Sequence, residues 1–307
     1  MPGSGKYIAL LCAVTFVSGG CSDEKKVVEV GAAGATSREP LEVVAAFGPL
    51  AELAERVGGS GVNVTNLTKT GVEPHDLEMN TAQIDAIQDA ALVVYLGESF
   101  QSAVEDAVKS RKGPSLELLS KVEPLEARQA DDGEHDPHFW LDPIRMAAAA
   151  EAIGDALSSV DATQAREYAT NAANYGSEMK ALDRELTTGL GGCKSRTFVT
   201  AHAAFGYLST RYKLEQVPVA GISPEVEPDP ARLADVADLV RTKGVTTIFT
   251  EELVSPKVAE ALARETGATT AVLSPIEGFT DEDLNAGTTY ATKMRENLAA
   301  LQKALSC

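Results

Sequence analysis

Short β-rich runs alternate with helical patterns along the chain from residue 40 onward. In the first half, strands are expected at 41–47, 62–68, 91–97 and 115–119. In the second half, strands are expected at 196–202, 214–221, 246–252 and 269–275. Helical patterns fill the intervals, including 49–57, 81–90 and 99–110. Because this alternation is typical of parallel sheets covered by helices, the pattern predicts an α/β fold with two lobes of the (βα)4 type.

One long helix is expected to join the two lobes. Residues 163–190 contain no Gly or Pro apart from Gly176 and Gly189. Their apolar side chains recur every three or four positions, at Tyr168, Ala172, Tyr175, Met179, Leu182, Leu186 and Leu190. A helix of this length extends about 40 Å at roughly 1.5 Å per residue, so it can run along both lobes. The lobes themselves are expected at 40–162 and 191–307.

The N-terminus carries the pattern of an export signal. Lys6 precedes an apolar run, and small residues then lead to Cys21. The run is too short to span a bilayer. The cleavage pattern resembles that of bacterial lipoproteins, although Ser18 stands where Leu is usual. We expect a signal at 1–20, a lipid on Cys21 and a flexible tether over 21–39; the alternative is a plain secretory signal that removes Cys21 or is cut nearby.

The four cysteines fit an exported protein. Cys12 lies within the signal and Cys21 is assigned to the lipid, which leaves Cys193 and Cys307 as an even pair. We expect a disulfide between them, two unrelated thiols being the alternative. The lipid on Cys21 would anchor the protein to the outer face of the cytoplasmic membrane, whereas its loss would leave the protein periplasmic or secreted.

The net charge of −18 over 307 residues restricts the partners of the protein. Affinity for phosphate backbones needs clustered Lys and Arg, so a nucleic-acid partner is excluded. Cations are the ligands that this charge balance favours.

Histidine is scarce, and its positions are informative. The chain has 4 His, two of them in the stretch EHDPHFWLDP at 134–143. His75, His138 and His202 each follow an expected strand, at the edge of the sheet where open α/β folds bind ligands. Three imidazoles from both lobes suit Zn²⁺, which takes tetrahedral ligand sets. A zinc site is therefore expected in the cleft between the lobes.

Residues around these histidines are expected to have supporting roles. The carboxylates that can orient the rings are Asp76, Glu78, Asp136 and Asp142. His135 lies in an acidic loop and is expected to be solvated. Phe139 and Trp140 are expected to pack the loop against the first lobe.

Five motifs resemble those of a known family. The chain is similar to the metal-binding lipoproteins of bacterial zinc and manganese ABC importers, the cluster A-I solute-binding proteins, in EPHDLE, DPHFWLDP, TAHAAFGYL, GISPEVEPDPARL and FTEELVSP. The resemblance covers nearly everything from Pro40 to Cys307. It implies a monomer that captures a transition metal outside the cytoplasmic membrane and hands it to a permease.

The resemblance also implies a ligand set. His75, His138 and His202 match the three histidine ligands of the family. Manganese members commonly have Glu at the third position, so His202 points to the zinc branch and to Zn²⁺ as the transported ligand.

Two departures from the family pattern concern metal binding. Many members carry an aspartate ligand in an LDP motif near the C-terminus, where this chain has Ser274 in VLSPIEG. A serine hydroxyl is a poor zinc ligand, so the fourth position is assigned to Glu251 or to water. The alternative role of Glu251 is to support a ligand or to cap a helix. The long His-rich loop of many zinc members is replaced here by ADDGEHD.

Three functional hypotheses follow. The leading one is the extracytoplasmic zinc-binding component of an ABC importer, which performs no turnover. A zinc hydrolase also uses three protein ligands and an open position, but the chain has no HExxH motif. A surface adhesin with a metal site is the third, and the sequence offers no feature that discriminates it.

Overall fold

The computed structural model describes residues 39–127 and 134–307. The expected signal, Cys21 and nearly all of the expected tether lie outside the described residues. Residues Glu39–Cys307 form one compact unit. Among the described helices, none combines the length and the apolar character that crossing a membrane requires.

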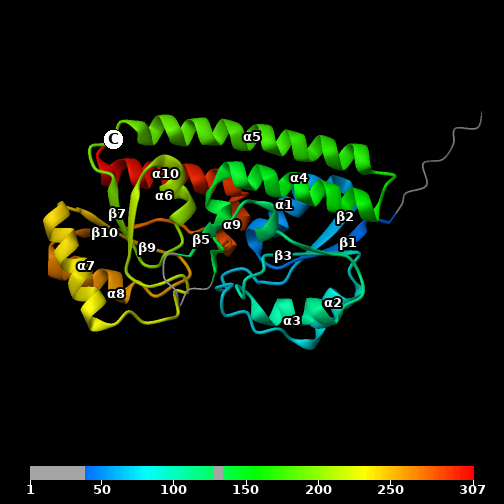
Figure 1. The fold of residues 1–307 in the computed structure, drawn as a ribbon, viewed down its shortest axis with the longest axis horizontal. Coiled ribbons are helices and arrows are strands. Elements are labelled where there is room, and N and C mark those ends of the chain that lie inside the picture. The colour runs from blue at the N-terminus through cyan, green and yellow to red at the C-terminus, as the bar shows by residue number, and fades with distance from the viewer. Residues whose placement is uncertain (1–38, 128–133) are drawn as a thin grey trace, which may run out of the picture. The chain divides into compact units, whose positions relative to one another are not determined.

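The first lobe contains a four-stranded parallel sheet in the order β2-β1-β3-β4. Its strands are β1 (Leu41–Ala45), β2 (Val62–Asn66), β3 (Leu92–Tyr95) and β4 (Ser115–Glu117). Its helices include α1 (Gly48–Gly58), α2 (Thr81–Asp89) and α3 (Ser102–Ser110). Figure 1 shows α2 and α3 on one side of this sheet and α1 on the other. Coverage of both faces explains why the central strands are rich in buried Val and Ala.

The second lobe repeats this topology. Its parallel sheet has the order β10-β9-β7-β8, so in both lobes the first strand lies between the second and the third. The strands are β7 (Thr197–Thr200), β8 (Glu215–Pro218), β9 (Thr247–Thr250) and β10 (Thr269–Val272). The helices of this lobe include α6 (Gly206–Tyr212), α7 (Pro230–Lys243) and α8 (Lys257–Thr266). The prediction of two similar parallel α/β lobes is confirmed.

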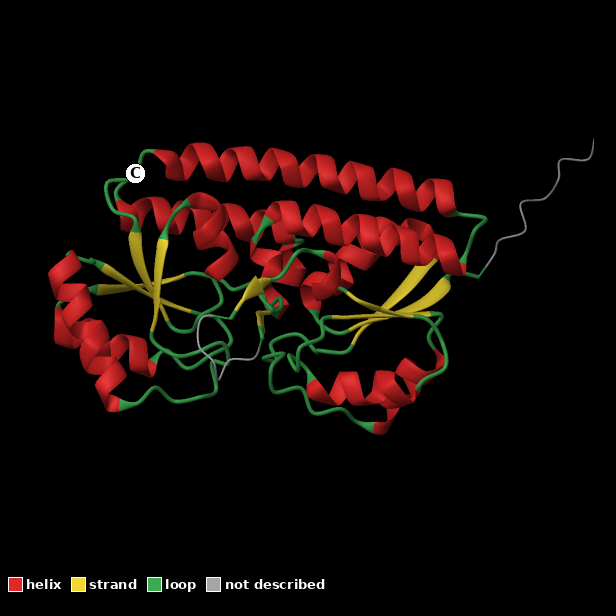
Figure 2. Cartoon of the chain, in the orientation of Figure 1, coloured by secondary structure: helices red, strands yellow, loops and turns green. Residues whose placement is uncertain are grey.

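Three long helices accompany both sheets on one side. They are α4 (Pro143–Val160), α5 (Ala165–Gly191) and α10 (Tyr290–Leu305). Figure 2 shows α5 as the outermost of them, passing over both lobes, and it packs on α1, α4 and α10. All the apolar stripe residues expected from the sequence are buried on α5. The long connecting helix is therefore confirmed, within two residues of the expected bounds.

Short elements were not expected from the sequence. A two-stranded antiparallel sheet pairs β5 (Leu125–Glu126) with β6 (His135–Asp136). The remaining elements are α9 (Asp281–Ala286), η1 (Gly59–Gly61), η2 (Leu119–Lys121) and η4 (Phe139–Leu141). Elements of two or three residues have no hydrophobic period, which is why the pattern could not predict them.

The hydrophobic core is shared between the lobes. One cluster is continuous from the first sheet through α4, α5 and α10 to Phe198 and Phe205 in the second lobe. A smaller cluster lies among the second sheet, α7 and α8. The expected disulfide between Cys193 and Cys307 is present and ties the end of α5 to the last residue of the chain.

Candidate metal centre

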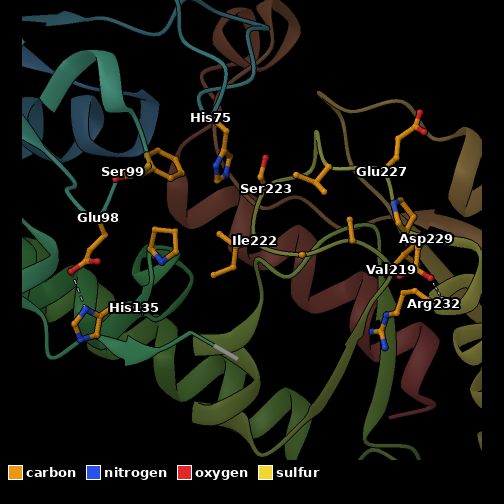
Figure 3. Close-up of a pocket in the computed structure, with 16 residues that line it drawn as sticks. His75, Glu98, Ser99, His135, Val219, Ile222, Ser223, Glu227, Asp229 and Arg232 are labelled. Atoms are coloured by element: carbon orange, nitrogen blue, oxygen red, sulfur yellow. Dashed lines mark hydrogen bonds and ion pairs between the residues drawn. The ribbon is translucent and has the colours of Figure 1, made fainter. Parts of the chain in front are cut away.

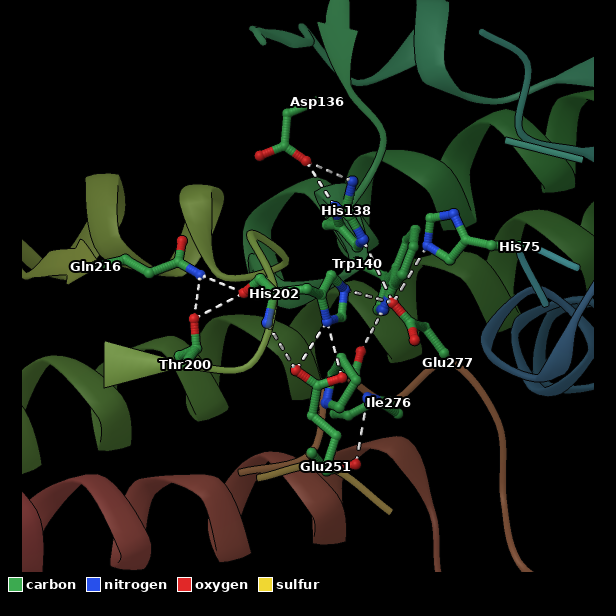
Figure 4. A network of polar contacts seen from close by, with 12 residues as sticks. His75, Asp136, His138, Trp140, Thr200, His202, Gln216, Glu251, Ile276 and Glu277 are labelled. Carbon is green, nitrogen blue, oxygen red and sulfur yellow. Dashed lines mark hydrogen bonds and ion pairs between the residues drawn. The ribbon is translucent and has the colours of Figure 1, made fainter. Parts of the chain in front are cut away.

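Four buried side chains meet between the two lobes. They are His75, His138, His202 and Glu277, and one potential ligand atom from each lies within 4.8 Å of the others. Glu277 Oε1 lies 3.6, 3.3 and 3.2 Å from the Nε2 atoms of His75, His138 and His202. Figure 4 shows the three rings directed toward this one carboxylate. The structure therefore brings together the three histidines that the sequence singled out.

Both lobes contribute to this group. His75 lies in the loop between β2 and α2, and His138 directly precedes η4. His202 follows β7, and Glu277 lies in the loop between β10 and α9. Each of the four therefore lies on a loop rather than within a strand or helix. His75, His202 and Glu277 follow strands of the parallel sheets, as expected at their carboxyl edge, whereas His138 follows β6 of the antiparallel pair.

Carboxylates behind two of the rings fix their orientation. His138 Nδ1 lies 2.8 Å from Asp136 Oδ1, and His202 Nδ1 lies 2.7 and 2.8 Å from the two oxygens of Glu251. A carboxylate at Nδ1 favours the tautomer in which Nδ1–H donates and Nε2 keeps its lone pair. Both rings therefore direct Nε2 toward Glu277, where this atom can bind a metal once it is unprotonated.

The structure places Glu251 behind His202, and not at the fourth ligand position assigned to it from the sequence. Its carboxylate contacts Nδ1 of the ring. This contact fits the alternative role given to Glu251 from the sequence, which is to support a ligand. Glu277 is the carboxylate that lies among the three Nε2 atoms. The family motif aligns with Ser274 and therefore gives no indication of Glu277. The carboxyl-edge argument applied to β10 would have found it, because Glu277 is the only ionisable residue in 273–280.

The turn that carries Glu277 is held by several hydrogen bonds. Asn297 of α10 accepts from the Ser274 backbone N–H at 2.8 Å and donates to its carbonyl at 2.7 Å. Ser274 Oγ accepts from the Ile276 backbone N–H at 3.2 Å, so this hydroxyl serves the turn. Ile276 has a φ of 53°, in the left-handed region that is costly for a β-branched residue. Surrounding contacts must offset this strain, which fixes the residue next to Glu277 in one conformation.

Aromatic side chains enclose the histidines. The His75 ring lies 4.4 Å from that of Phe100, and the His138 ring lies 5.1 Å from that of Trp140, between centroids. Trp140 Nε1 donates to the Pro275 carbonyl at 2.7 Å, which links the first lobe to the turn before Glu277. Trp140 and Phe139 are fully buried, as the sequence analysis expected.

The other acidic candidates near the histidines have different roles. Asp142 caps α4 and pairs with Arg145 and Arg211, so it does not orient a histidine. Glu78 is exposed. His135 lies outside the group of four, with Nδ1 3.0 Å from Glu98 Oε1 and its side chain 26% exposed.

The four groups perturb one another strongly. Burial lowers the pKa of His75, and Glu277 only partly offsets this. Burial also acts to lower the pKa of His138 and His202, but their carboxylate partners prevail and raise both, that of His202 well above its ordinary value. Burial acts to raise the pKa of Glu277, yet the three histidines hold it well below its usual range. The Glu277 carboxylate and the imidazoles of His138 and His202 therefore favour each other's charged forms.

A cavity of about 710 Å³ opens beside this group. It is lined by His75 and Phe100 from the first lobe and by residues 219–223 and 226–229 from the second. Figure 3 shows His75 facing it, with the His135–Glu98 pair at another side. The His75 side chain is 8% exposed, whereas those of His138 and His202 are 0% exposed. An ion that enters from this cavity therefore meets His75 first.

The donor atoms fit a metal ion. His75 Nε2, His138 Nε2, His202 Nε2 and both oxygens of Glu277 are buried and have no hydrogen-bond partner among the described residues. Buried polar atoms are nearly always satisfied, so a converging set of unsatisfied ones is typical of a cation-binding site. Three imidazole nitrogens and one carboxylate oxygen form a ligand set that Zn²⁺ takes in tetrahedral geometry.

Comparison with known sequences identifies relatives over almost the whole chain. The family described as "Zinc-uptake complex component A periplasmic" matches residues 43–304. Zinc-binding protein AdcA of Streptococcus pyogenes is 35% identical, over 85% of this chain and 55% of its own length. The chain thus spans about half of that relative. The high-affinity zinc uptake system protein ZnuA of Bacillus subtilis is 33% identical, over 98% of this chain and 97% of its own length.

Solved structures agree with these sequence matches. The Zn(II)-bound ZnuA-like domain of Streptococcus pneumoniae AdcA has a TM-score of 0.74 and 34% identity, covering 88% of this chain and 100% of that one. The laminin-binding protein Lmb of Streptococcus agalactiae has a TM-score of 0.78 and 32% identity, covering 87% and 100%. Fold, site and sequence agree: the chain belongs to the family of periplasmic A components of zinc-uptake complexes.

Proposed function

We propose that this protein is the extracytoplasmic zinc-binding component of an ABC importer, and that it binds Zn²⁺ through His75, His138, His202 and Glu277. The observation that carries the proposal is the convergence of unsatisfied, buried donor atoms from both lobes. Zinc is the cargo of this protein, so its role in uptake consists of binding and release.

The zinc ligands are divided between the two lobes. His75 and His138 belong to the first lobe, and His202 and Glu277 belong to the second. A bound ion therefore links the two lobes, and separating them removes ligands from it in pairs. Release to a permease follows from such a separation, because no other change is needed to weaken the site.

The pattern around Cys21 supports a location at the cytoplasmic membrane. Relatives in Streptococcus pneumoniae are named zinc-binding lipoproteins. We infer that Cys21 carries the lipid here and holds a monomer near a permease in the cytoplasmic membrane. Labelling with a radioactive fatty acid should mark the wild-type protein and not the Cys21→Ala variant.

Metal analysis tests the cargo directly. Protein purified without chelator should contain one zinc ion per molecule, which dialysis against a strong chelator removes and added zinc restores. A His202→Ala variant should lose this zinc, whereas His135→Ala should keep it, because His135 lies outside the group of four. A protein that retains manganese in preference to zinc, or His135→Ala behaving like His202→Ala, would contradict the proposal.

Two other functions were considered from the sequence. Family membership places the chain among uptake components and not among zinc hydrolases. An adhesin role is raised by the relative Lmb, which is described as having adhesin and metal-transporting activity. Binding of the purified protein to immobilised laminin, with and without zinc, tests whether that second role extends to this chain.

A further inference from the structure

A second group of carboxylates lies next to the zinc ligands. Glu73 and Asp76 belong to the loop between β2 and α2, and Glu225 belongs to the loop between β8 and α7. One carboxylate oxygen from each lies within 4.8 Å of the others. Three carboxyl groups from two lobes thus approach one another closely enough for one cation to contact all of them.

The buried member of this group lacks a partner. Glu73 is only 9% exposed, and both of its carboxylate oxygens are buried without a hydrogen-bond donor among the described residues. Asp76 and Glu225 are exposed, so the group is open to solvent on one side and closed on the other. Burial and the nearby Glu277 raise the pKa of Glu73 to about 8, so a cation bound at this group would take the place of its proton.

The donor set differs from that of the zinc site. It consists of carboxylate oxygens alone, whereas the zinc site has three imidazoles. Oxygen-only sets suit hard cations such as Ca²⁺ and Mn²⁺, and imidazole suits zinc. The two groups are therefore expected to take different ions.

We propose that Glu73, Asp76 and Glu225 form an outer site for an oxygen-preferring divalent cation, Ca²⁺ or Mn²⁺, which links the loops of the two lobes beside the zinc site. Because two ligands come from the first lobe and one from the second, the bound cation holds the lobes together. It thereby slows the loss of zinc. This role is separate from zinc binding itself, which the outer site does not supply.

Binding is tested with Mn²⁺ on the zinc-loaded full-length protein, so that the inner site is filled and its zinc content is measured before and after. Free Mn²⁺ is followed by its electron paramagnetic resonance signal. About one Mn²⁺ per molecule should bind, with a dissociation constant of about 10⁻⁴ to 10⁻³ M, as in weak extracellular oxygen sites. Added Ca²⁺ should displace it.

Two matched variants decide where the cation binds. Glu225→Gln should weaken Mn²⁺ binding tenfold or more with zinc content unchanged, because the exposed side chain is not a zinc ligand. Glu227→Gln changes another exposed acid of the same loop, outside the group, and should leave Mn²⁺ binding unchanged. Absence of Mn²⁺ binding in wild type, or equal binding by wild type and Glu225→Gln, overturns the outer site while leaving the zinc proposal intact.

A separate measurement tests whether the outer cation holds the two lobes together. The rate of zinc transfer to a chelator that does not bind Ca²⁺ appreciably should fall severalfold when Ca²⁺ is added to wild type or to Glu227→Gln. The rate for Glu225→Gln should not respond. If Ca²⁺ leaves the wild-type rate unchanged, the cation does not hold the lobes together.

Discussion

At the scale of single residues, two glutamates near His202 have different roles, and substitution separates them. Glu277→Gln removes the charged ligand atom and should weaken zinc binding about a hundredfold or more. Glu251→Gln disturbs only the support of the His202 ring and should cost about 10- to 100-fold, as supporting carboxylates typically do. Competition titration with a chelator measures both.

Ser274→Ala is the internal comparison for this pair. The hydroxyl accepts a hydrogen bond from the Ile276 N–H and is not assigned to the metal, so the expected loss of zinc affinity is small. A larger loss from Glu251→Gln than from Glu277→Gln would reverse the assignment of ligand and support.

Protonation of the free site predicts a pH dependence. Zinc needs the Nε2 lone pair of each ring, and the pKa of His202 lies well above its ordinary value in the metal-free protein. This ring therefore holds its proton more tightly than an ordinary imidazole, and zinc competes with that proton. Affinity should rise as pH rises through neutrality and fall as pH drops. His75, whose pKa is lowered, adds its competition only in more acidic solution.

Calorimetric titration at pH 7 in buffers of different ionisation enthalpy measures this release. We expect at least one proton to leave the protein for each zinc bound. An observed enthalpy that is the same in all buffers would show that the free site holds no displaceable proton.

The sequence predicted the three histidines because each lies at a strand end, and strand ends of parallel sheets converge. It did not predict Glu277 as a ligand, because that assignment depends on which acid reaches the cluster from the second lobe. Glu251 and Glu277 both follow strands of that sheet. Only side-chain packing decides between them.

At the scale of elements, the alternation of β-rich runs and helical patterns predicted the eight strands of the two parallel sheets. The apolar stripe at 163–190 predicted α5. The contact between α10 and the turn before Glu277 could not be predicted, because Asn297 and Ser274 are 23 positions apart and no local pattern relates them. Tertiary hydrogen bonds of this kind leave no local signal in the sequence.

The same contact yields a prediction. Asn297→Ala would leave the buried N–H and carbonyl of Ser274 without partners, at about 1–3 kcal/mol for each group. The free energy of unfolding should fall by about 2–6 kcal/mol, and zinc affinity should fall because the turn loosens next to Glu277. Chemical denaturation and chelator competition measure the two effects.

Glu296→Gln is the control on the same helix. The Glu296 side chain is 59% exposed, so its substitution should change neither quantity appreciably. If Asn297→Ala lowered stability but left zinc affinity unchanged, α10 would support the fold without positioning the ligand.

At the scale of the whole molecule, the two lobes are joined unequally on their two sides. On the α5 side they share one continuous hydrophobic core, and in the cleft they meet through loops that carry ligands. Opening of the cleft is therefore expected to be small, because a larger movement would disrupt the buried stripe of α5. The pattern of α5 could be predicted from sequence, whereas the shared core depends on α4 and α10 packing beside it.

The disulfide closes the second lobe at the end of α5 and predicts a loss of stability on its removal. Cys193 and Cys307 are separated by 114 positions. In the chain-entropy account, closing such a loop stabilises the folded state by about 4 to 5 kcal/mol, which is an upper figure.

The double variant Cys193→Ser/Cys307→Ser leaves neither partner cysteine as an unpaired thiol, and its free energy of unfolding without zinc should be lower by up to that amount. Zinc affinity should be retained, because neither cysteine lies in a loop that carries a ligand. Reduction of the mature wild-type protein should reproduce the destabilisation. Two titratable thiols in the denatured, unreduced mature protein, which lacks Cys12 and carries its lipid on Cys21, would contradict the prediction, as would equal unfolding free energies.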